Sequence, residues 1–185
     1  MSSALRACLI LSSAVLASPA VAQNLKGDIH AGLDSISSEG ESQEGVTSGL
    51  TLSYDLPQPR TVIGVQLDLD ATDNRSCESD LIVAGDRACI AGKRDSAINL
   101  RLGRKLGGIA TIVGTIGYAN GRFEASYAGA GITASTHETL DGVRLGIGIR
   151  VDVGRKLYAR ADYRYTNYEQ GVSRNQGLVG IGLTF

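Results

Sequence analysis

Hydrophobic and polar residues alternate strictly along much of this chain. In the segment Val143–Val153 every odd position is Val, Leu or Ile, and every even position is Arg, Gly or Asp. Because successive side chains of a strand point to opposite faces, this period of two predicts a β-strand with one apolar and one polar face. Similar alternation predicts eight strands in all: Leu25–Ser35, Val46–Leu56, Thr61–Ala71, Ser96–Gly103, Ile109–Ala119, Val143–Val153, Leu157–Tyr168 and Gly177–Phe185.

The connections between these strands alternate in length. Four are long, at Ile36–Gly45, Thr72–Asp95, Asn120–Gly142 and Glu169–Gln176. Three are tight, at Pro57–Arg60, Arg104–Gly108 and Gly154–Lys156. An even number of strands with short turns at one end and long loops at the other is the layout of an outer-membrane barrel. The pattern therefore predicts an all-β fold, an eight-stranded antiparallel up-and-down transmembrane β-barrel with short periplasmic turns and long extracellular loops.

A soluble sandwich or lipocalin-like barrel is the alternative, with the apolar faces buried and the polar faces in water. The polar faces of this chain mix Gly, Thr and single charges of both signs, and the sequence contains 24 Gly. An eight-stranded barrel is only wide enough for side chains to fill it, so small and paired polar residues suit its interior. This composition favours the membrane barrel, with outer-membrane lipid against the apolar faces.

The C-terminal residues resemble a known family. Arg160–Tyr168 (RADYRYTNY), Ser173–Asn175 (SRN) and Leu178–Phe185 (LVGIGLTF) are similar to the last hairpin of the outer-membrane β-barrel domain family, the small opacity-type, porin-family proteins of Gram-negative bacteria. The resemblance implies an outer-membrane barrel with a structural or surface-interacting role, seldom an enzyme. It also implies contact with periplasmic chaperones and recognition by the barrel-assembly machinery, through an alternating C-terminal signal: Val179, Ile181, Leu183 and Phe185.

The first 22 residues predict a secretory signal peptide. One basic residue, Arg6, precedes an apolar run over residues 7–17, and the small residues Ala20 and Ala22 mark a cleavage site before Gln23. The run is about half of the ~20 residues that a membrane-spanning helix needs, which disfavours an anchor. Residues 23–185 are then the barrel.

Two cysteines remain in the exported chain, Cys77 and Cys89, separated by eleven residues. An even number of cysteines in an exported protein predicts a disulfide, and the sequence nearby offers no further zinc ligands. Two free thiols are the alternative. The bond would cross-link the loop Thr72–Asp95, whose role the sequence leaves open.

The polar faces carry charges of both signs at similar heights. When residues are counted along each strand from its turn end, one set of charged residues lies about two to three residues from that end, and another set lies about seven to nine residues from it. Because buried charges are costly unless they are paired, we expect these side chains to meet across the bore and close it. The lower set is Asp28, Arg101, Arg150 and Arg160, and the upper set is Asp34, Asp68, Asp70, Arg144 and Arg164.

Aromatic residues on the apolar faces predict interfacial girdles at both ends of the barrel. Tyr118, Tyr163 and Tyr165 lie toward the loop end, and Tyr54 and Phe185 toward the turn end. Tyr158 and Tyr168 have the opposite parity and are expected to face the lumen.

The sequence offers little catalytic chemistry. Asp68, Asp70 and Asp73 resemble the start of a calcium loop that lacks its Gly and distal Glu. Ser135, His137 and Glu138 have the residue types of a hydrolase site but lie in a predicted loop. His30 is expected to be a hydrogen-bonding partner in the lumen. We predict no catalytic, metal or cofactor site.

Three functions compete. The favoured one is a non-enzymatic, structural outer-membrane protein whose long loops bind a host or envelope ligand. The others are a small-solute porin of low conductance, which needs an open lumen, and an outer-membrane lipid-modifying enzyme, which needs catalytic groups at the rim. The net charge of −1 disfavours nucleic acid as a partner.

Overall fold

The computed structural model describes residues 24–38, 41–79, 86–129 and 132–185, and the predicted cleavage site at Ala20, Ala22 and Gln23 lies outside them. These residues form nine β-strands and one short 3₁₀ helix, η1 (Glu169–Gly171). The strands are β1 (Leu25–Ser38), β2 (Glu41–Asp55), β3 (Thr61–Thr72), β4 (Arg75–Ser79), β5 (Arg87–Leu106), β6 (Ala110–Gly129), β7 (Ile132–Asp152), β8 (Leu157–Tyr168) and β9 (Ser173–Thr184).

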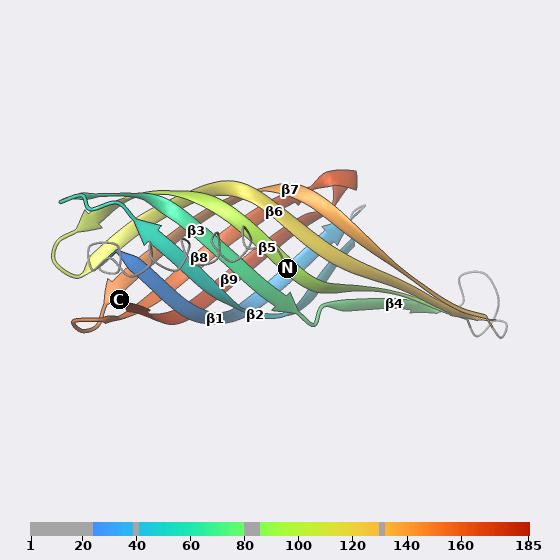
Figure 1. Cartoon of the computed structure of the whole chain (residues 1–185). Helices are drawn as coiled ribbons and strands as arrows, with labels where there is room; N and C mark the ends of the chain where they lie inside the picture. The colour runs from blue at the N-terminus through green and yellow to red at the C-terminus, as the bar shows by residue number, and fades with distance from the viewer. Residues whose placement is uncertain (1–23, 39–40, 80–85, 130–131) are drawn as a thin grey trace, which may run out of the picture.

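The strands form one antiparallel sheet that closes on itself (Figure 1). Neighbours run in the order β3-β2-β1-β9-β8-β7-β6-β5-β4, and the additional pairing of β3 with β5 closes the barrel. β3 and β4 lie end to end along β5, where they pair with residues 94–104 and 87–91 respectively. The nine strands therefore occupy eight positions around the barrel, and we call each of these positions a stave. The predicted eight-stranded antiparallel barrel is confirmed.

The prediction of long loops at Thr72–Asp95 and Asn120–Gly142 is wrong, because much of each segment forms strands. β5, β6 and β7 have 20, 20 and 21 residues, against 12 each for β3, β8 and β9. Beyond the last row shared with β3 they continue together, with β4 at the edge, as a twisted ribbon that projects from one end of the barrel (Figure 1). We call this ribbon the arm: residues 75–79, 87–92, 123–129 and 132–138.

The other two predicted loops are also shorter than expected. β1 and β2 extend to Ser38 and Glu41, and β9 begins at Ser173 after η1. The opposite end of the barrel has the tight turns. Pro57 and Pro59 lie between β2 and β3 and break no ladder, and Gly107 turns β5 into β6 with φ = 63°, which favours glycine.

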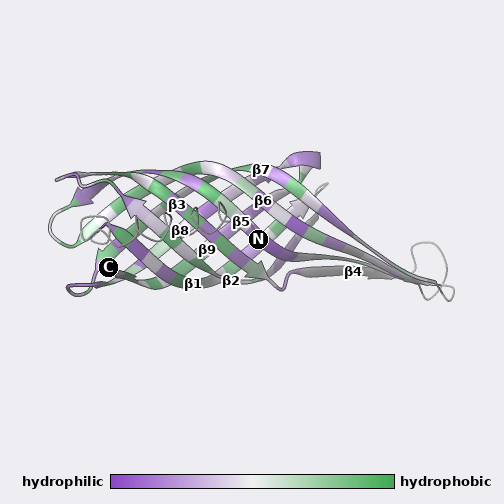
Figure 2. Cartoon of the chain, viewed as in Figure 1, coloured by the Kyte–Doolittle hydropathy of each residue, from purple (hydrophilic) through white to green (hydrophobic). Residues whose placement is uncertain are grey.

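The distribution of polar and apolar residues is the reverse of that in a soluble protein. Among the described residues, 23 polar or charged residues are buried against nine hydrophobic ones. Large Leu, Ile and Val side chains are exposed on the outer wall of every barrel stave, and Figure 2 shows hydrophobic and hydrophilic positions alternating along the strands. In the part of the chain that the structure describes, no helix is long and apolar enough to cross a membrane. A closed barrel with an apolar outer wall and a polar interior matches a transmembrane β-barrel.

A closed barrel predicts heat-modifiable migration. The sheet satisfies its backbone hydrogen bonds internally, so the folded protein should resist SDS until it is boiled. Unboiled and boiled samples are expected to run at different positions in the same gel. Identical migration of the two samples from a folded preparation would contradict the closed barrel.

Candidate functional site

The charged interior begins at the turn end with one carboxylate and three cations. Asp55 of β2 accepts a hydrogen bond from Lys26 Nζ at 2.8 Å. Arg101 Nε lies 3.0 Å from the same carboxylate, and Arg150 Nη1 lies 3.9 Å from it. These residues come from four different staves. Alternate residues of every strand face the lumen, so side chains from separate strands meet near the barrel axis.

The next layer is centred on Asp28 of β1. Arg160 Nε lies 3.1 Å from Asp28 and 3.0 Å from Asp162, and the Tyr158 hydroxyl donates to Asp28 at 2.9 Å. Arg160 Nη2 lies 3.2 Å from His30 Nδ1. Because a guanidinium has no acceptor, Nδ1 accepts this bond and the ring proton belongs on Nε2. Nε2 then donates to Asp70 at 2.6 Å.

Two carboxylates of β3 share one arginine in the central layer. Arg164 Nη2 lies 3.0 Å from Asp68 and Nη1 lies 3.2 Å from Asp70, with all three side chains at most 3 % exposed. Asp68 also accepts hydrogen bonds from Thr51 at 2.7 Å and from Asn99 at 2.8 Å. Such charge-assisted bonds are what allow ionised groups to stay buried.

The uppermost layer joins strands that are far apart in the sequence. Arg174 of β9 donates to both oxygens of Asp34, at 2.8 and 2.6 Å, and to Asp95 of β5 at 2.7 Å. Asp95 also pairs with Arg144 of β7 and accepts a bond from the Tyr168 hydroxyl at 2.8 Å. The bidentate Arg174–Asp34 pair fixes the geometry of this layer.

An apolar cluster covers the loop-side end of the charged interior. Leu140 and Tyr168 pack with Ala97 and Ala119, and Phe123 meets Tyr168 edge to face with ring centroids 5.7 Å apart. Aromatic pairs prefer this arrangement. Because Tyr168 also binds Asp95, the cluster lies directly against the upper charged layer.

We call these buried and half-buried ionic side chains the lumen network. It contains seven carboxylates and seven cations, so its formal charges cancel with His30 neutral. Within it remains a cavity of about 20 Å³, room for about one water molecule. The members are Lys26, Asp28, Asp34, Asp55, Asp68, Asp70, Asp95, Arg101, Arg144, Arg150, Arg160, Asp162, Arg164 and Arg174.

The structure places all nine charged residues proposed from the sequence in the lumen, but it changes several partners. Asp34 pairs with Arg174 and not with Arg144 or Arg164, because it lies one layer higher. Arg101 and Arg150 meet Asp55, not Asp28. The nine residues are Asp28, Asp34, Asp68, Asp70, Arg101, Arg144, Arg150, Arg160 and Arg164.

Sequence reasoning missed five members of the network. Asp95 and Arg174 were assigned to loops, although each continues the lumen parity of its strand through Ala97 and Gln176. Asp55, Lys26 and Asp162 lie on polar faces that the alternation did identify. Extending β5 and β9 by parity alone would have found Asp95 and Arg174, whereas the other three already lay within the predicted strands.

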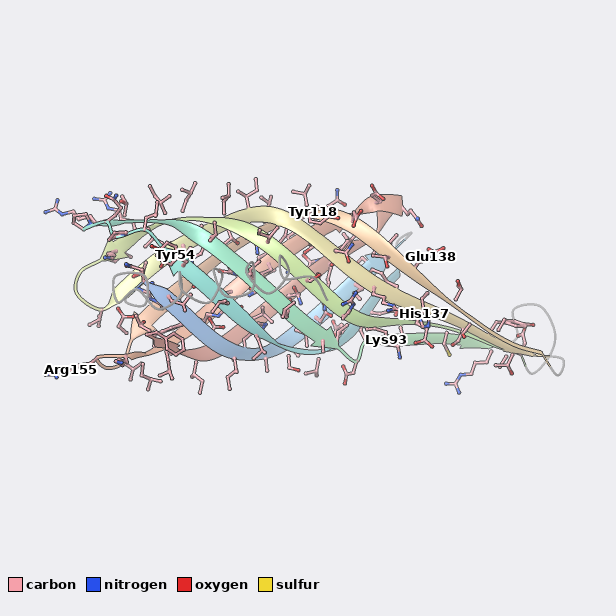
Figure 3. The ribbon with its side chains drawn as sticks, viewed as in Figure 1. Tyr54, Lys93, Tyr118, His137, Glu138 and Arg155 are labelled. Atoms are coloured by element: carbon pink, nitrogen blue, oxygen red, sulfur yellow. The ribbon has the colours of Figure 1, made fainter. Side chains whose placement is uncertain are left out.

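The aromatic residues follow the predicted parity. Tyr118 and Tyr163 are about half exposed on the outer wall, as is Phe185, whereas Tyr158 and Tyr168 are each 3 % exposed inside. Figure 3 shows Tyr54 near the turn end and Tyr118 nearer the arm. Outward aromatic residues near both ends are the arrangement expected of interfacial girdles.

The β7 edge of the arm is exposed on both faces. The residues from Thr133 to Thr139 are all exposed. Tyr127 donates to the buried Asp86 at 3.1 Å, and partial burial together with this bond raises the pKa of the Tyr127 hydroxyl. Cys77 of β4 lies directly opposite Cys89 of β5 in the register.

The predicted catalytic candidates are not assembled into a site. His137 and Glu138 are neighbours on β7, so they point to opposite faces of the arm (Figure 3). Asp68 and Asp70 are occupied by arginines and His30. Among the described residues, no group of three His, Cys, Asp or Glu side chains is arranged to hold a metal ion.

The fold is similar to that of solved barrel structures. The Ail attachment invasion locus protein of Yersinia pestis, crystallised with the heparin analogue sucrose octasulfate, superimposes with a TM-score of 0.58 at 12 % identity, covering 88 % of this chain and 99 % of that chain. Neisserial surface protein A superimposes with a TM-score of 0.58 at 14 % identity, covering 88 % and 97 %. At these identities the likeness shows the barrel fold alone. No curated protein sequence matches the chain significantly.

The family assignment rests on the sequence match. A family model described as the outer membrane protein beta-barrel domain matches residues 7–185, nearly the whole chain. This agrees with the closed eight-stave barrel, the apolar outer wall and the resemblance of the C-terminal hairpin. The chain therefore belongs to the outer membrane protein β-barrel domain family, which indicates the outer membrane of a Gram-negative bacterium as its location.

Proposed function

We propose that this protein is a non-enzymatic outer-membrane barrel with a structural and surface-interaction role, and that its lumen is closed. The arm is the observation that carries this proposal. Its strands exceed their barrel neighbours by about eight residues, which at ~3.3 Å per residue projects a β-ribbon roughly 26 Å beyond the rim. A ribbon of this length, exposed on both faces along its β7 edge, suits contact with another surface more than solute passage.

The lumen network supports a closed bore. Four charged layers with cancelling charge leave a cavity for about one water molecule, and the apolar cluster around Tyr168 covers the upper layer. At the turn end an open basin of about 710 Å³ reaches only as far as Lys26, Asp55 and Arg150 of the lowest layer. A hydrated path would have to separate several buried ion pairs, which is strongly unfavourable.

Chain export and assembly complete the proposal. Residues 1–22 are proposed as a signal peptide cleaved before Gln23. The outward-facing C-terminal residues are proposed as the signal read by the barrel-assembly machinery, with periplasmic chaperones escorting the chain: Val179, Ile181, Leu183 and Phe185.

We further propose that a disulfide joins Cys77 and Cys89 and stiffens the arm. Directly opposite residues of an antiparallel pair have Cα atoms about 4.5–5.5 Å apart, within the range that a disulfide spans. Closing a loop of about a dozen residues contributes up to roughly 3 kcal/mol in the chain-entropy model. Replacing both cysteines by serine should therefore speed proteolysis within the arm and leave heat-modifiable migration unchanged. Intact-mass analysis showing two free thiols in the membrane-purified protein would contradict the bond.

The arm's role is tested on intact cells. A variant in which one short turn joins residue 72 to residue 94 and a second joins residue 122 to residue 139 lacks the arm and keeps every barrel stave. Cells displaying the full chain should adhere to an epithelial monolayer, and cells displaying the arm-shortened variant at equal surface level should lose that adhesion. Equal adhesion by the two strains, with heat-modifiable barrels in both, would refute the surface-interaction role.

A further inference from the structure

Two arginines face each other on the outer wall of the barrel. Arg94 of β5 is the register partner of Arg122 of β6, and both side chains are exposed on the outward parity. Like charges directly opposite in an antiparallel pair repel each other. In the described part of the chain, neither arginine has an ion-pair partner.

The pair lies just above the membrane-facing band. Moving outward along β5 and β6, the outward-facing rows are Ile98 with Tyr118, then Ser96 with Asn120, then Arg94 with Arg122. Each row is two residues, about 7 Å, above the last. The arginines therefore stand two rows beyond the girdle tyrosine on the arm side, at the height of the outer-leaflet headgroups.

Neighbouring charges are already engaged. Lys93, at the β-bulge beside Arg94, lies 3.0 Å from Glu124. Asp141 of β7, one row below Arg122, accepts hydrogen bonds from Tyr118 at 2.5 Å and from Asn120 at 2.6 Å. Neither carboxylate forms an ion pair with Arg94 or Arg122, so the described contacts leave the hydrogen-bond donors of both guanidinium groups open.

We propose that Arg94 and Arg122 together bind a phosphate on the headgroup of a phosphorylated outer-leaflet glycolipid. Guanidinium groups recognise phosphate with paired hydrogen bonds, and an anion between them converts their repulsion into attraction. The acyl chains of the same lipid would lie along the apolar wall below, over Ile98 and Tyr118. This site is independent of the arm's proposed role, because it lies on the barrel wall.

Lipid A in nanodiscs provides the test. The full mature chain is reconstituted in phosphatidylcholine nanodiscs containing increasing fractions of bis-phosphorylated lipid A, and the lipid A retained per barrel is counted by native mass spectrometry. The Arg94→Gln/Arg122→Gln variant should bind at least about tenfold more weakly, because it loses two charge-assisted contacts. Lipid A without phosphates should bind the wild type as weakly as phosphorylated lipid A binds this variant.

Matched variants separate this site from general charge and from misfolding. Arg104→Gln removes an exposed cation from the same strand at the turn end and should leave lipid A retention unchanged. Arg122→Glu places a carboxylate opposite Arg94, so it should keep a heat-modifiable barrel and still lose lipid A. Retention at wild-type level by Arg122→Glu or by the double glutamine variant, or equal retention of dephosphorylated lipid A, would overturn the proposal.

Discussion

Replacing Arg164 by methionine should destabilise the barrel by about 3 kcal/mol, because removing one partner of a buried pair leaves the other charge uncompensated. Arg164 contacts both Asp68 and Asp70 at the centre of the lumen network, where both carboxylates are fully buried. Methionine keeps much of the side-chain volume, so the loss reports charge and not a cavity. Urea unfolding in lipid vesicles, followed by far-UV circular dichroism, measures the free energy of unfolding.

Two further variants identify the cause. Arg104→Met removes an exposed arginine of β5 and should change the free energy of unfolding by less than about 0.5 kcal/mol. Adding Asp68→Asn and Asp70→Asn to Arg164→Met should recover part of the lost stability, because the stranded charges are removed. An Arg164→Met variant as stable as the wild type would show that the lumen network does not hold the barrel together.

Adding a single methyl group at Gly49 should cost about 2–3 kcal/mol. The His30–Asp70 hydrogen bond runs from β1 to β3 across β2, and Gly49 is the residue of β2 that lies between them in the register. A Cβ at Gly49 would clash with the Leu69 carbonyl oxygen of β3 and would lie 2.5 Å from Asp70 Oδ1 and 2.7 Å from His30 Nε2. Alanine there must push the two apart, which adds overpacking to the loss of a buried hydrogen bond.

The control for Gly49→Ala is Gly114→Ala. A Cβ at Gly114 would have its nearest contact at 3.7 Å, an ordinary van der Waals distance. Both variants change glycine to alanine within a strand, so the loss of glycine's conformational freedom is matched and the difference reports the close contacts at Gly49. Equal unfolding free energies for the two variants would contradict the role of Gly49 as the gap through which His30 reaches Asp70.

The alternation of residues predicted the barrel because lipid outside and a packed polar lumen inside impose different chemistry on alternate positions. The same reasoning failed in the arm. Residues such as Thr133 and Glu138 lie on a stretch of β7 that is exposed on both faces, so no alternation marks them as strand. Hydrophobic periodicity reports which face is buried, and strand pairing without burial leaves no such trace.

Pairing within the lumen was predictable only in part. The sequence showed that Asp68, Asp70 and Arg164 share the inner face at similar heights, and these three do meet. Asp34 with Arg174 was not foreseeable, because the relative height of β1 and β9 depends on the stagger at which the barrel closes. That stagger is a property of the closed sheet and of no single strand.

The proposal that the lumen is closed is tested most directly by current recordings from the purified protein in a planar lipid bilayer. Four paired layers and a cavity for about one water molecule predict no steady conductance from the wild type at moderate voltage. Arg164→Met combined with Asp68→Ala and Asp70→Ala, which empties the central layer, serves as the positive comparison and should raise the frequency of openings. Silence from correctly inserted wild-type barrels would support the account, and a large, stable single-channel step from the wild type would contradict it.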